Sequence, residues 1–349
     1  MNVQVQRSEL LVTMNRCASV AFSSLAPRSL SQTTAPHLRH VINRTMATIA
    51  DMAIDAKKNK TSHEERTANE FRARGIHQVT LSSVKQINPR IRLVQLSITD
   101  RKRGIDFLAG QWLDTFIPGL PKAGGFTITS TPSQALPYTQ QAPFQHQDTR
   151  PTPFLELAIQ KSPNNPPAAY LWKPMNEIIG TQLLVRVGGG FVWPPTSVER
   201  SDVKTLVLIA GGVGINPLIS IISHLHETES MPQRVHILYS TKIEPGASAD
   251  ETLFLPRLMN IAKAAPETVK LQLFASGAER SVIGEGFPEE VHTRHMSVDD
   301  VQKILPTMAE RESALCYVCG PQQMTDYFVD CLRKLDGLNE KNVLCEKWW

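Results

Sequence analysis

The sequence predicts a mixed β and α/β fold, in which an antiparallel barrel is followed by a doubly wound parallel sheet. Two patterns carry this prediction. Between residues 76 and 187, short segments of alternating apolar and polar residues follow one another without a long helical pattern. From residue 205 onward, short apolar runs alternate with helical patterns, as in a parallel sheet with helices on its faces.

Composition agrees with such a two-domain protein and argues against some functions. The chain has 349 residues, of which 41% are hydrophobic, and this is sufficient for two buried cores. Its net charge of +4 is modest and no basic stripe is interleaved with aromatic residues, so nucleic acid is not an expected partner. The apolar stretch over residues 205–225 has Gly, Asn and Pro at its midpoint, so no membrane-spanning segment is expected there.

The barrel is expected to be built from short strands. Residues 154–160 show the alternation most clearly, because Leu155, Leu157 and Ile159 fall on one face. Residues 132–153 are rich in Pro and Gln, so we expect a surface loop there, either a disordered insertion or a flap over a binding site. The expected strands are residues 78–83, 92–99, 110–117, 125–129, 154–160 and 182–187.

A glycine-rich turn, GGVGINP at residues 211–217, joins the first strand of the second domain to a helix. Residues 206–210 are short, branched and uncharged, which is typical of a buried parallel strand. The glycines allow a tight turn and a close approach to a ligand, and Asn216 is expected to cap the helix with Pro217 in its first turn. Such a helix start suits a pyrophosphate, although a glycine cluster alone also fits a purely structural turn.

The second domain continues with alternating strands and helices. Residues 235–239, 271–274 and 315–318 are expected as strands, and residues 253–264, 298–308 and 322–335 as helices. In doubly wound sheets, ligands bind beyond the carboxyl ends of the strands. The glycine-rich turn and the segment Cys319-Gly320-Pro321 both follow strands directly, so they are expected to lie at one edge of the sheet.

Three motifs then occur in order: AGGVGINP at residues 210–217, YVCGPQQM at 317–324 and EKWW at 346–349. In order and spacing they resemble the motifs of the ferredoxin-NADP reductase superfamily, and the resemblance extends from His77 to the C-terminus. It implies an antiparallel Greek-key, flavin-binding barrel of the ferredoxin reductase type over residues 75–196. It also implies an NAD(P)-binding domain over residues 203–349.

The resemblance implies roles for individual residues as well. In this superfamily the glycine-rich loop holds the pyrophosphate of NAD(P)H, and the Cys-Gly-Pro motif places a thiol beside the nicotinamide. A near-terminal aromatic residue stacks on the flavin, although Trp348 and Trp349 also fit a hydrophobic plug that closes the last strand. The implied cofactor-binding residues are Gly211, Gly212, Val213, Gly214, Ile215, Asn216, Phe126, Thr127, Gly320, Pro321 and Trp348, and the implied catalytic residues are Thr127, Cys319 and Glu346.

The sequence departs from the superfamily pattern at the flavin phosphate. Where the family commonly has Arg-x-Tyr-Ser, this chain has GGFT at residues 124–127: Phe126 can stack and Thr127 keeps a hydroxyl, but Gly124 has no charge. The next family loop supplies Gly and Ser, whereas here residues 165–169 read NPPAA, with fewer N–H and hydroxyl donors. FAD is the expected flavin, and FMN stays open.

Two functions from different classes follow. The first is a flavin-dependent oxidoreductase that transfers hydride from NAD(P)H to a bound flavin and electrons to an unknown acceptor, for which a redox protein is one candidate. The second is a mitochondrial NAD(H)-binding regulatory or assembly protein with a degenerate flavin site. NAD is expected over NADP, because Glu244 and Glu279 accompany the cations Lys242 and Arg280 that would bind a 2′-phosphate.

The N-terminus predicts a location. Residues 10–50 contain no Asp or Glu and have arginines spaced among Ser, Thr and Ala, so residues 1–50 are expected to form a mitochondrial transit peptide. Residues 51–74 are charged and are expected to form a solvated helix or linker. No metal is expected, because Cys316 and Cys319 resemble half of a metal site but no second pair accompanies them.

Overall fold

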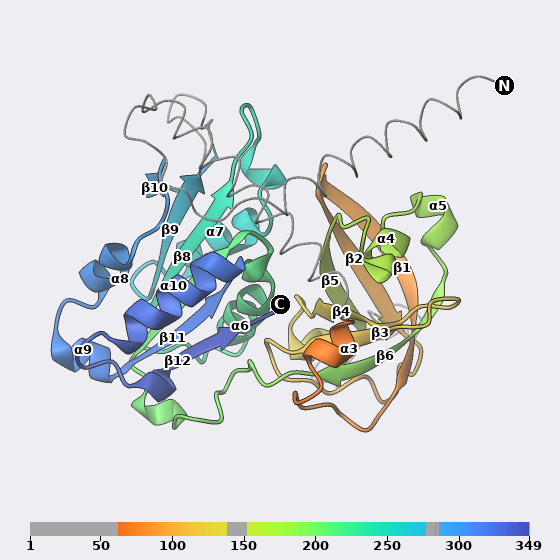
Figure 1. The fold of residues 1–349 in the computed structure, drawn as a ribbon, viewed down its shortest axis with the longest axis horizontal. Coiled ribbons are helices and arrows are strands. Elements are labelled where there is room, and N and C mark those ends of the chain that lie inside the picture. Colours follow the sequence, from red (N-terminus) through yellow and green to blue (C-terminus); the bar gives the residue numbers. More distant parts are fainter. Residues whose placement is uncertain (1–61, 138–151, 277–282, 284–285, 349) are drawn as a thin grey trace, which may run out of the picture. The chain divides into compact units, whose positions relative to one another are not determined.

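A computed structural model describes residues 62–137, 152–276, 283 and 286–348 (Figure 1). The predicted transit peptide, residues 51–61, the charged residues Glu279 and Arg280, and Trp349 lie outside the described residues. The described part contains a six-stranded antiparallel sheet followed by a six-stranded parallel sheet with helices. The predicted fold class is therefore confirmed.

The first sheet closes into a barrel. Its strand order is β4-β3-β6-β1-β2-β5, and an isolated bridge between Ile128 and Leu157 joins the two edge strands. Leu155, Leu157 and Ile159 are all buried in one core, as their alternation predicted. The strands are β1 (His77–Asn88), β2 (Ile91–Ile98), β3 (Trp112–Phe116), β4 (Gly124–Thr127), β5 (Phe154–Gln160) and β6 (Gln182–Gly188).

Short helices complete the barrel domain. The expected surface loop over residues 132–153 begins instead with a 3-10 turn, η1 (Pro132–Ala135), in which Ala135 is fully buried and its carbonyl accepts from Ile105 N at 3.0 Å. Residues 138–151 of that loop lie outside the described part. Two further helices, α4 (Pro166–Leu171) and α5 (Met175–Ile178), connect β5 to β6.

Residues 62–74 pack against the barrel, which differs from the solvated helix or linker expected there. The helical turn α3 (His63–Arg66) lies beside β4 (Figure 1), and His63 and Thr67 are buried. Arg72 reaches the buried carboxylate of Asp114, with Nε to Oδ2 at 2.9 Å. The segment is therefore part of the barrel domain.

The parallel sheet has the strand order β10-β9-β8-β7-β11-β12. Both its faces are apolar: β7 residues Leu206 and Leu208 belong to one core and Val207 and Ile209 to the other. This explains the continuous apolar run in the sequence. The strands are β7 (Thr205–Gly211), β8 (Arg234–Lys242), β9 (Val269–Ser276), β10 (Val291–His292), β11 (Ala314–Cys319) and β12 (Val343–Glu346).

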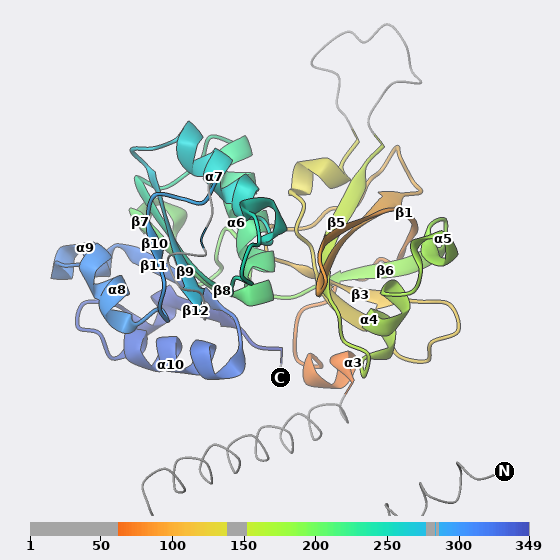
Figure 2. The same cartoon turned by 90° about the horizontal axis from the view of Figure 1, so that it is seen from above.

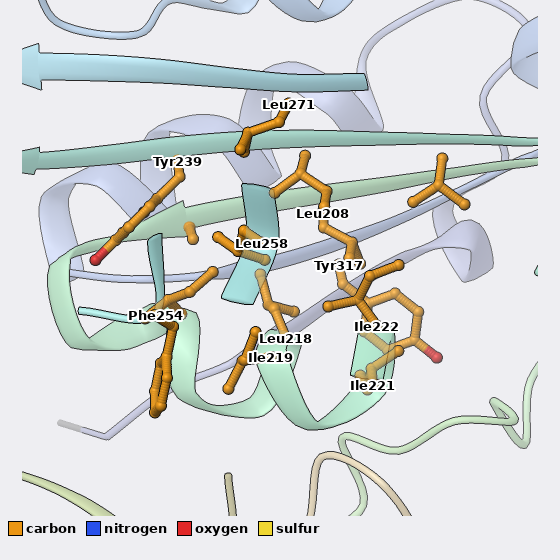
Figure 3. Packing of buried hydrophobic residues seen from close by; sticks show 14 of the residues in the cluster. Leu208, Leu218, Ile219, Ile221, Ile222, Tyr239, Phe254, Leu258, Leu271 and Tyr317 are labelled. Atoms are coloured by element: carbon orange, nitrogen blue, oxygen red, sulfur yellow. The ribbon is translucent and has the colours of Figure 1, made fainter. Parts of the chain in front are cut away.

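Helices cover both faces of this sheet (Figure 2). On one face α6 (Ile215–Glu227) and α7 (Leu255–Ala264) pack, and Figure 3 shows Leu218 and Ile222 of α6 directed toward Leu208. On the other face lie α8 (Val298–Ile304) and α10 (Gln322–Arg333). The single helix expected over residues 298–308 ends at Ile304, before Pro306, and α9 (Met308–Glu312) follows.

Specific hydrogen bonds join the two domains. Tyr317 donates its hydroxyl to the carbonyl of Val192 at 2.6 Å, and Ser220 Oγ donates to the carbonyl of Ser130 at 2.8 Å. No helix among the described residues is long and apolar enough to span a membrane.

Candidate functional site

The glycine-rich turn and the Cys-Gly-Pro segment meet at one point of the parallel sheet. β7 and β11 are hydrogen-bonded neighbours, while β8 lies on the far side of β7 and β12 on the far side of β11. After β7 the chain continues through α6 to β8, and after β11 it continues through α10 to β12, so the two connections run in opposite directions across the sheet. This is the topological switch point, where doubly wound sheets bind ligands. The sequence correctly predicted that the two loops share an edge.

The start of α6 differs from the expected one. The turn Gly212–Gly214 is already 3-10 helical, so the N-cap is Gly214 and Asn216 lies inside the first turn together with Pro217. The prediction that Asn216 caps the helix is therefore wrong. Its side chain instead crosses to the barrel, where Nδ2 donates to the carbonyl of Ala158 at 3.1 Å. No side chain caps α6 or the 3-10 turn before it. Ile215 N–H bonds to the carbonyls of Gly212 and Val213, and Pro217 has no N–H, so the N–H groups that remain for an anion are those of the turn Gly212–Gly214.

Glycine is required in this turn for steric reasons. A Cβ on Gly211 would lie 2.5 Å from Met324 Sδ and 2.7 Å from Pro321 Cδ. A Cβ on Gly214 would overlap the backbone carbonyl of Cys319, which cannot move without shifting β11. The two loops therefore contact each other through their glycines, and a purely structural role explains part of the motif.

A cavity of about 500 Å³ lies where these loops face the barrel. It collects nearly all of the implied cofactor-binding residues, and Ile215 is the exception because it is fully buried in the core. We call this cavity the cleft. Its lining is Gly125, Phe126, Thr127, Ala158, Gln160, Ser162, Asn165, Ala168, Gly211, Gly212, Val213, Gly214, Asn216, Cys319, Gly320, Pro321 and Trp348.

The three candidate catalytic residues lie at or beside the cleft. Thr127 and Cys319 line it, whereas Glu346 pairs with Cys319 across β11 and β12 and contacts the cleft through Trp348. Burial raises the pKa of the Glu346 carboxyl well above its usual range. Burial, with smaller contributions from Glu346 and Cys345, also raises the pKa of the Cys319 thiol. Both environments favour the protonated, uncharged group.

Trp348 forms one wall of the cleft. Its indole is half-buried and also borders a second cavity of about 400 Å³, so it separates two open spaces. The ring of His63 stacks against the Trp348 indole, with ring centroids 5.8 Å apart and ring planes inclined by 26°. A hydrophobic plug would be enclosed on all sides, so this arrangement favours an aromatic wall that faces a ligand.

The residues present fit a planar aromatic ring in the cleft. Phe126 and Trp348 both contribute aromatic surface to it, and Thr127 adds a hydroxyl. A positively charged side chain from position 124 is sterically excluded, because a Cβ on Gly124 would lie 2.5 Å from Pro167 Cβ and 2.6 Å from Phe126 Cε2. A flavin ring is thus accommodated, and any cation for its phosphate must come from another segment.

A further cavity of about 510 Å³ continues from the cleft along the nucleotide domain, sharing Gln160, Gly212 and Val213 with it. At the end of β8, Lys242 Nζ lies 2.8 Å from Glu244 Oε1, and this contact lowers the pKa of Glu244. The opposite wall is the turn between β1 and β2, which includes Arg90. Arg90 is not among the site residues that the sequence predicts, because nothing local in that turn indicates that it faces the other domain.

The described residues contain no group of three or more His, Cys, Asp or Glu side chains placed to hold a metal ion. Cys316 and Cys319 are both buried free thiols, one inside β11 and one at its end. Burial raises the pKa of Cys316 to about 12. The half-site pattern in the sequence is thus two buried thiols of one strand, with Cys319 at its end.

The fold and the cleft define a two-domain protein of the ferredoxin reductase type, in which an antiparallel barrel is joined to a nucleotide-binding domain. The family model of the oxidoreductase NAD-binding domain matches residues 208–330. Over 301 residues the chain is 33% identical to the Xenopus tropicalis protein "oxidoreductase NAD-binding domain-containing protein 1", covering 84% of this chain and 86% of that protein. The chain belongs to this family.

Solved structures with low sequence identity share the fold. A ferredoxin NADP+ reductase from Neisseria gonorrhoeae with bound FAD and NADP matches with a TM-score of 0.55 at 16% identity, covering 78% of this chain and 99% of that one. The CS-b5R domains of human Ncb5or in the NAD+ form match with a TM-score of 0.57 at 17% identity, covering 78% of this chain and 70% of that one.

Proposed function

We propose that the protein is an NAD(P)H-dependent flavoprotein oxidoreductase, which transfers hydride from NADH to a flavin in the cleft and passes electrons to an acceptor. The observation that carries this proposal is the composition of the cleft. One cavity combines the glycine-rich turn that opens α6 with two aromatic walls, Phe126 and Trp348. Membership of an oxidoreductase family with an NAD-binding domain supports the same function.

The dinucleotide would bind across the nucleotide domain. Its pyrophosphate suits the N–H groups of the turn Gly212–Gly214 that opens α6, and its adenosine half suits the cavity between β8 and the β1–β2 turn. We propose NAD as the preferred nucleotide, because Glu244 can accept from a ribose 2′-hydroxyl while it neutralises Lys242. A 2′-phosphate would have to displace this carboxylate.

A bound flavin would supply the hydride-accepting chemistry, and the chain would position the partners. Phe126 and Trp348 would hold the ring and keep water from it, and Thr127 would offer a hydrogen bond at its edge. Trp348 would have to move aside for the nicotinamide, and the neighbouring cavity of about 400 Å³ leaves room for that movement. The protonated Glu346 would hold the indole without adding a negative charge.

A second function is favoured by one observation. No side chain fits at Gly124, and Pro166 and Pro167 have no N–H to offer, so the flavin phosphate lacks the contacts that the superfamily provides there. This supports an NAD(H)-binding regulatory or assembly protein with a degenerate flavin site.

An absorption spectrum of the full chain, followed by anaerobic addition of NADH and then NADPH, separates these functions. For the oxidoreductase we expect a flavin band that NADH bleaches faster than NADPH. A colourless protein that takes up neither FAD nor FMN but binds NADH would exclude the oxidoreductase and leave the regulatory function.

We further propose a mitochondrial location, on the composition of residues 1–50 alone. Import of a fluorescent fusion carrying these residues, compared with a fusion in which Arg16, Arg28, Arg39 and Arg44 are replaced by Glu, tests it. Equal distribution of the two fusions would exclude this location signal.

A further inference from the structure

A side cavity of about 290 Å³ adjoins the cleft, with which it shares Gly125 and Asn165. It lies between three segments: the helical turn α3, the end of the β3–β4 connection, and the start of α4. The side cavity therefore borders the place where a ligand ring would lie in the cleft. Its lining is Ser62, His63, Arg66, Leu120, Pro121, Lys122, Ala123, Gly124, Gly125, Asn164, Asn165, Pro166 and Pro167.

The ionisable side chains that line the side cavity are all basic. Its ionisable lining residues are His63, Arg66 and Lys122, and no carboxylate lines it. Glu65 accepts from the backbone N of Ser62 at 2.6 Å, which holds it at the start of α3. Lys122 lies 3.5 Å from Glu65, but both side chains are more than half exposed, so this ion pair is weak and exchangeable. The side cavity therefore suits an anion.

Two acidic residues, Glu64 and Glu65, lie near the side cavity, and each accepts a hydrogen bond from a backbone N–H group. Glu64 accepts from the backbone N of Ala123 at 3.4 Å on the rim of the cavity. Among the remaining walls, Gly124 has no side chain and Pro166 and Pro167 have no N–H, while Ser62, Asn164 and Asn165 offer uncharged donors. Arg66 and Lys122 are thus the permanently charged side chains that an anion in this cavity would meet.

The turn that carries Arg66 is firmly anchored. His63 Nε2 lies 3.0 Å from Asp114 Oδ1, and the ring packs edge-on against Trp112 with centroids 4.6 Å apart. Arg72 donates to the carbonyl of Thr67 at 2.5 Å and ties the end of the turn to the same aspartate. The backbone that carries Arg66 is therefore held by buried contacts, and the exposed side chain of Arg66 extends from this fixed point.

We propose that α3 completes the flavin site, with Arg66 and Lys122 binding the phosphate of a flavin nucleotide whose ring lies in the cleft. This inference rests on the proposed function. It assigns a binding role to a segment that precedes the barrel in sequence, and it explains how the chain tolerates glycine at position 124. A guanidinium and an ammonium in one cavity can both donate to phosphate oxygens.

The test compares the dissociation constants of riboflavin, FMN and FAD for the full chain, measured by quenching of flavin fluorescence. Riboflavin has the same ring and no phosphate, so it reports on the cleft and on correct folding. We expect Arg66→Ala to weaken FMN and FAD binding by about 10- to 100-fold and to leave riboflavin unchanged. Arg66→Lys and Lys122→Ala should show smaller losses. Arg74→Ala is the matched control, because Arg74 is exposed, follows in the same segment and lines none of the cavities described.

Each outcome decides a specific point. If Arg66→Ala binds FMN and FAD as well as Arg74→Ala does, the inference is overturned while the proposed function stands. Equal losses for riboflavin and FMN would also overturn it, because α3 would then act on the ring site or on folding alone. If the wild-type chain binds none of the three flavins, the proposed function itself fails, and the inference with it.

Discussion

The indole Nε1 of Trp348 donates a hydrogen bond to Oε2 of Glu346 at 3.0 Å, so the aromatic wall of the cleft is held by a buried carboxyl group two positions earlier in the chain. Glu346 is 8% exposed and ends β12, beside Cys319. The end of the last strand thereby orients the residue that separates the two cavities. Through this contact the protonation state of Glu346 affects the position of Trp348, and with it the shape of the cleft.

Glu346→Gln should change the pH dependence of stability. Because the pKa of Glu346 is raised in the folded state, the folded chain binds this proton more tightly than the unfolded chain. Its contribution to stability is fully present below the usual pKa of 4.5 and is lost as pH rises toward the folded-state pKa. At pH 8 we expect Glu346→Gln to be more stable than wild type by about 1–3 kcal/mol, measured by urea unfolding. Glu267→Gln, on an exposed residue, should follow the wild-type profile.

Asp114→Asn should destabilise the barrel. Asp114 is fully buried, and Arg72 and Arg186 both reach its Oδ2, at 2.9 and 2.7 Å. Burial alone would raise the pKa of Asp114, but hydrogen bonds from His63, Arg72 and Arg186 outweigh burial and lower it. Removal of the charge leaves the guanidinium groups uncompensated, so we expect a loss of about 3 kcal/mol in chemical unfolding.

The control for this prediction is Asp330→Asn, which breaks an exposed pair with Lys334 and should cost less than about 0.5 kcal/mol. Similar losses for the two variants would contradict a structural role of the Asp114 cluster. Because the pKa of Asp114 is lowered, its contribution is present above its usual pKa of 3.8 and is lost as pH falls below that value. The difference between wild type and Asp114→Asn should therefore shrink in acid.

Gly214→Ala should damage the nucleotide site more than Gly212→Ala. The added methyl group at position 214 meets the backbone of Cys319, and overpacking of this kind costs about 1–3 kcal/mol. Gly212 has no atom near its Cβ position but has a φ of 52°, so alanine there costs about 1 kcal/mol of backbone strain. Thermal unfolding together with NADH titration measures both. An equal loss of NADH affinity in the two variants would contradict the steric explanation.

Glu244→Ala should shift the nucleotide preference toward NADPH. The change releases Lys242, which Glu244 contacts at 2.8 Å, and removes an anion that would repel a 2′-phosphate. We expect the NADPH-to-NADH affinity ratio to rise by about tenfold, measured by fluorescence titration. Glu199→Ala is an exposed control outside the cavity. An unchanged ratio would mean that the adenosine half binds elsewhere.

Much of the fold could be predicted from local patterns. The alternation of Leu155, Leu157 and Ile159 predicted β5 with the bounds that it has in the structure, because strand side chains alternate between core and surface. The glycine-rich segment after β7 predicted a strand, a tight turn and a helix, because glycine and proline set the conformation of the residues next to them. Helix ends were less predictable: α6 begins before Asn216, because the turn Gly212–Gly214 is already 3-10 helical and Gly214 has helical backbone angles.

The sequence by itself determined the order of most strands and helices and the edge of the sheet where the two loops meet. These features depend on periodicity and on glycine and proline, which act over a few residues. Through its resemblance to the superfamily, the sequence also indicated eleven of the seventeen residues that line the cleft. Only the tertiary structure decided that α3 packs on Asp114, that Asn216 binds the barrel at Ala158, and that Arg90 faces the nucleotide domain. These contacts join segments far apart in the chain, and their partners are chosen by packing rather than by any local pattern.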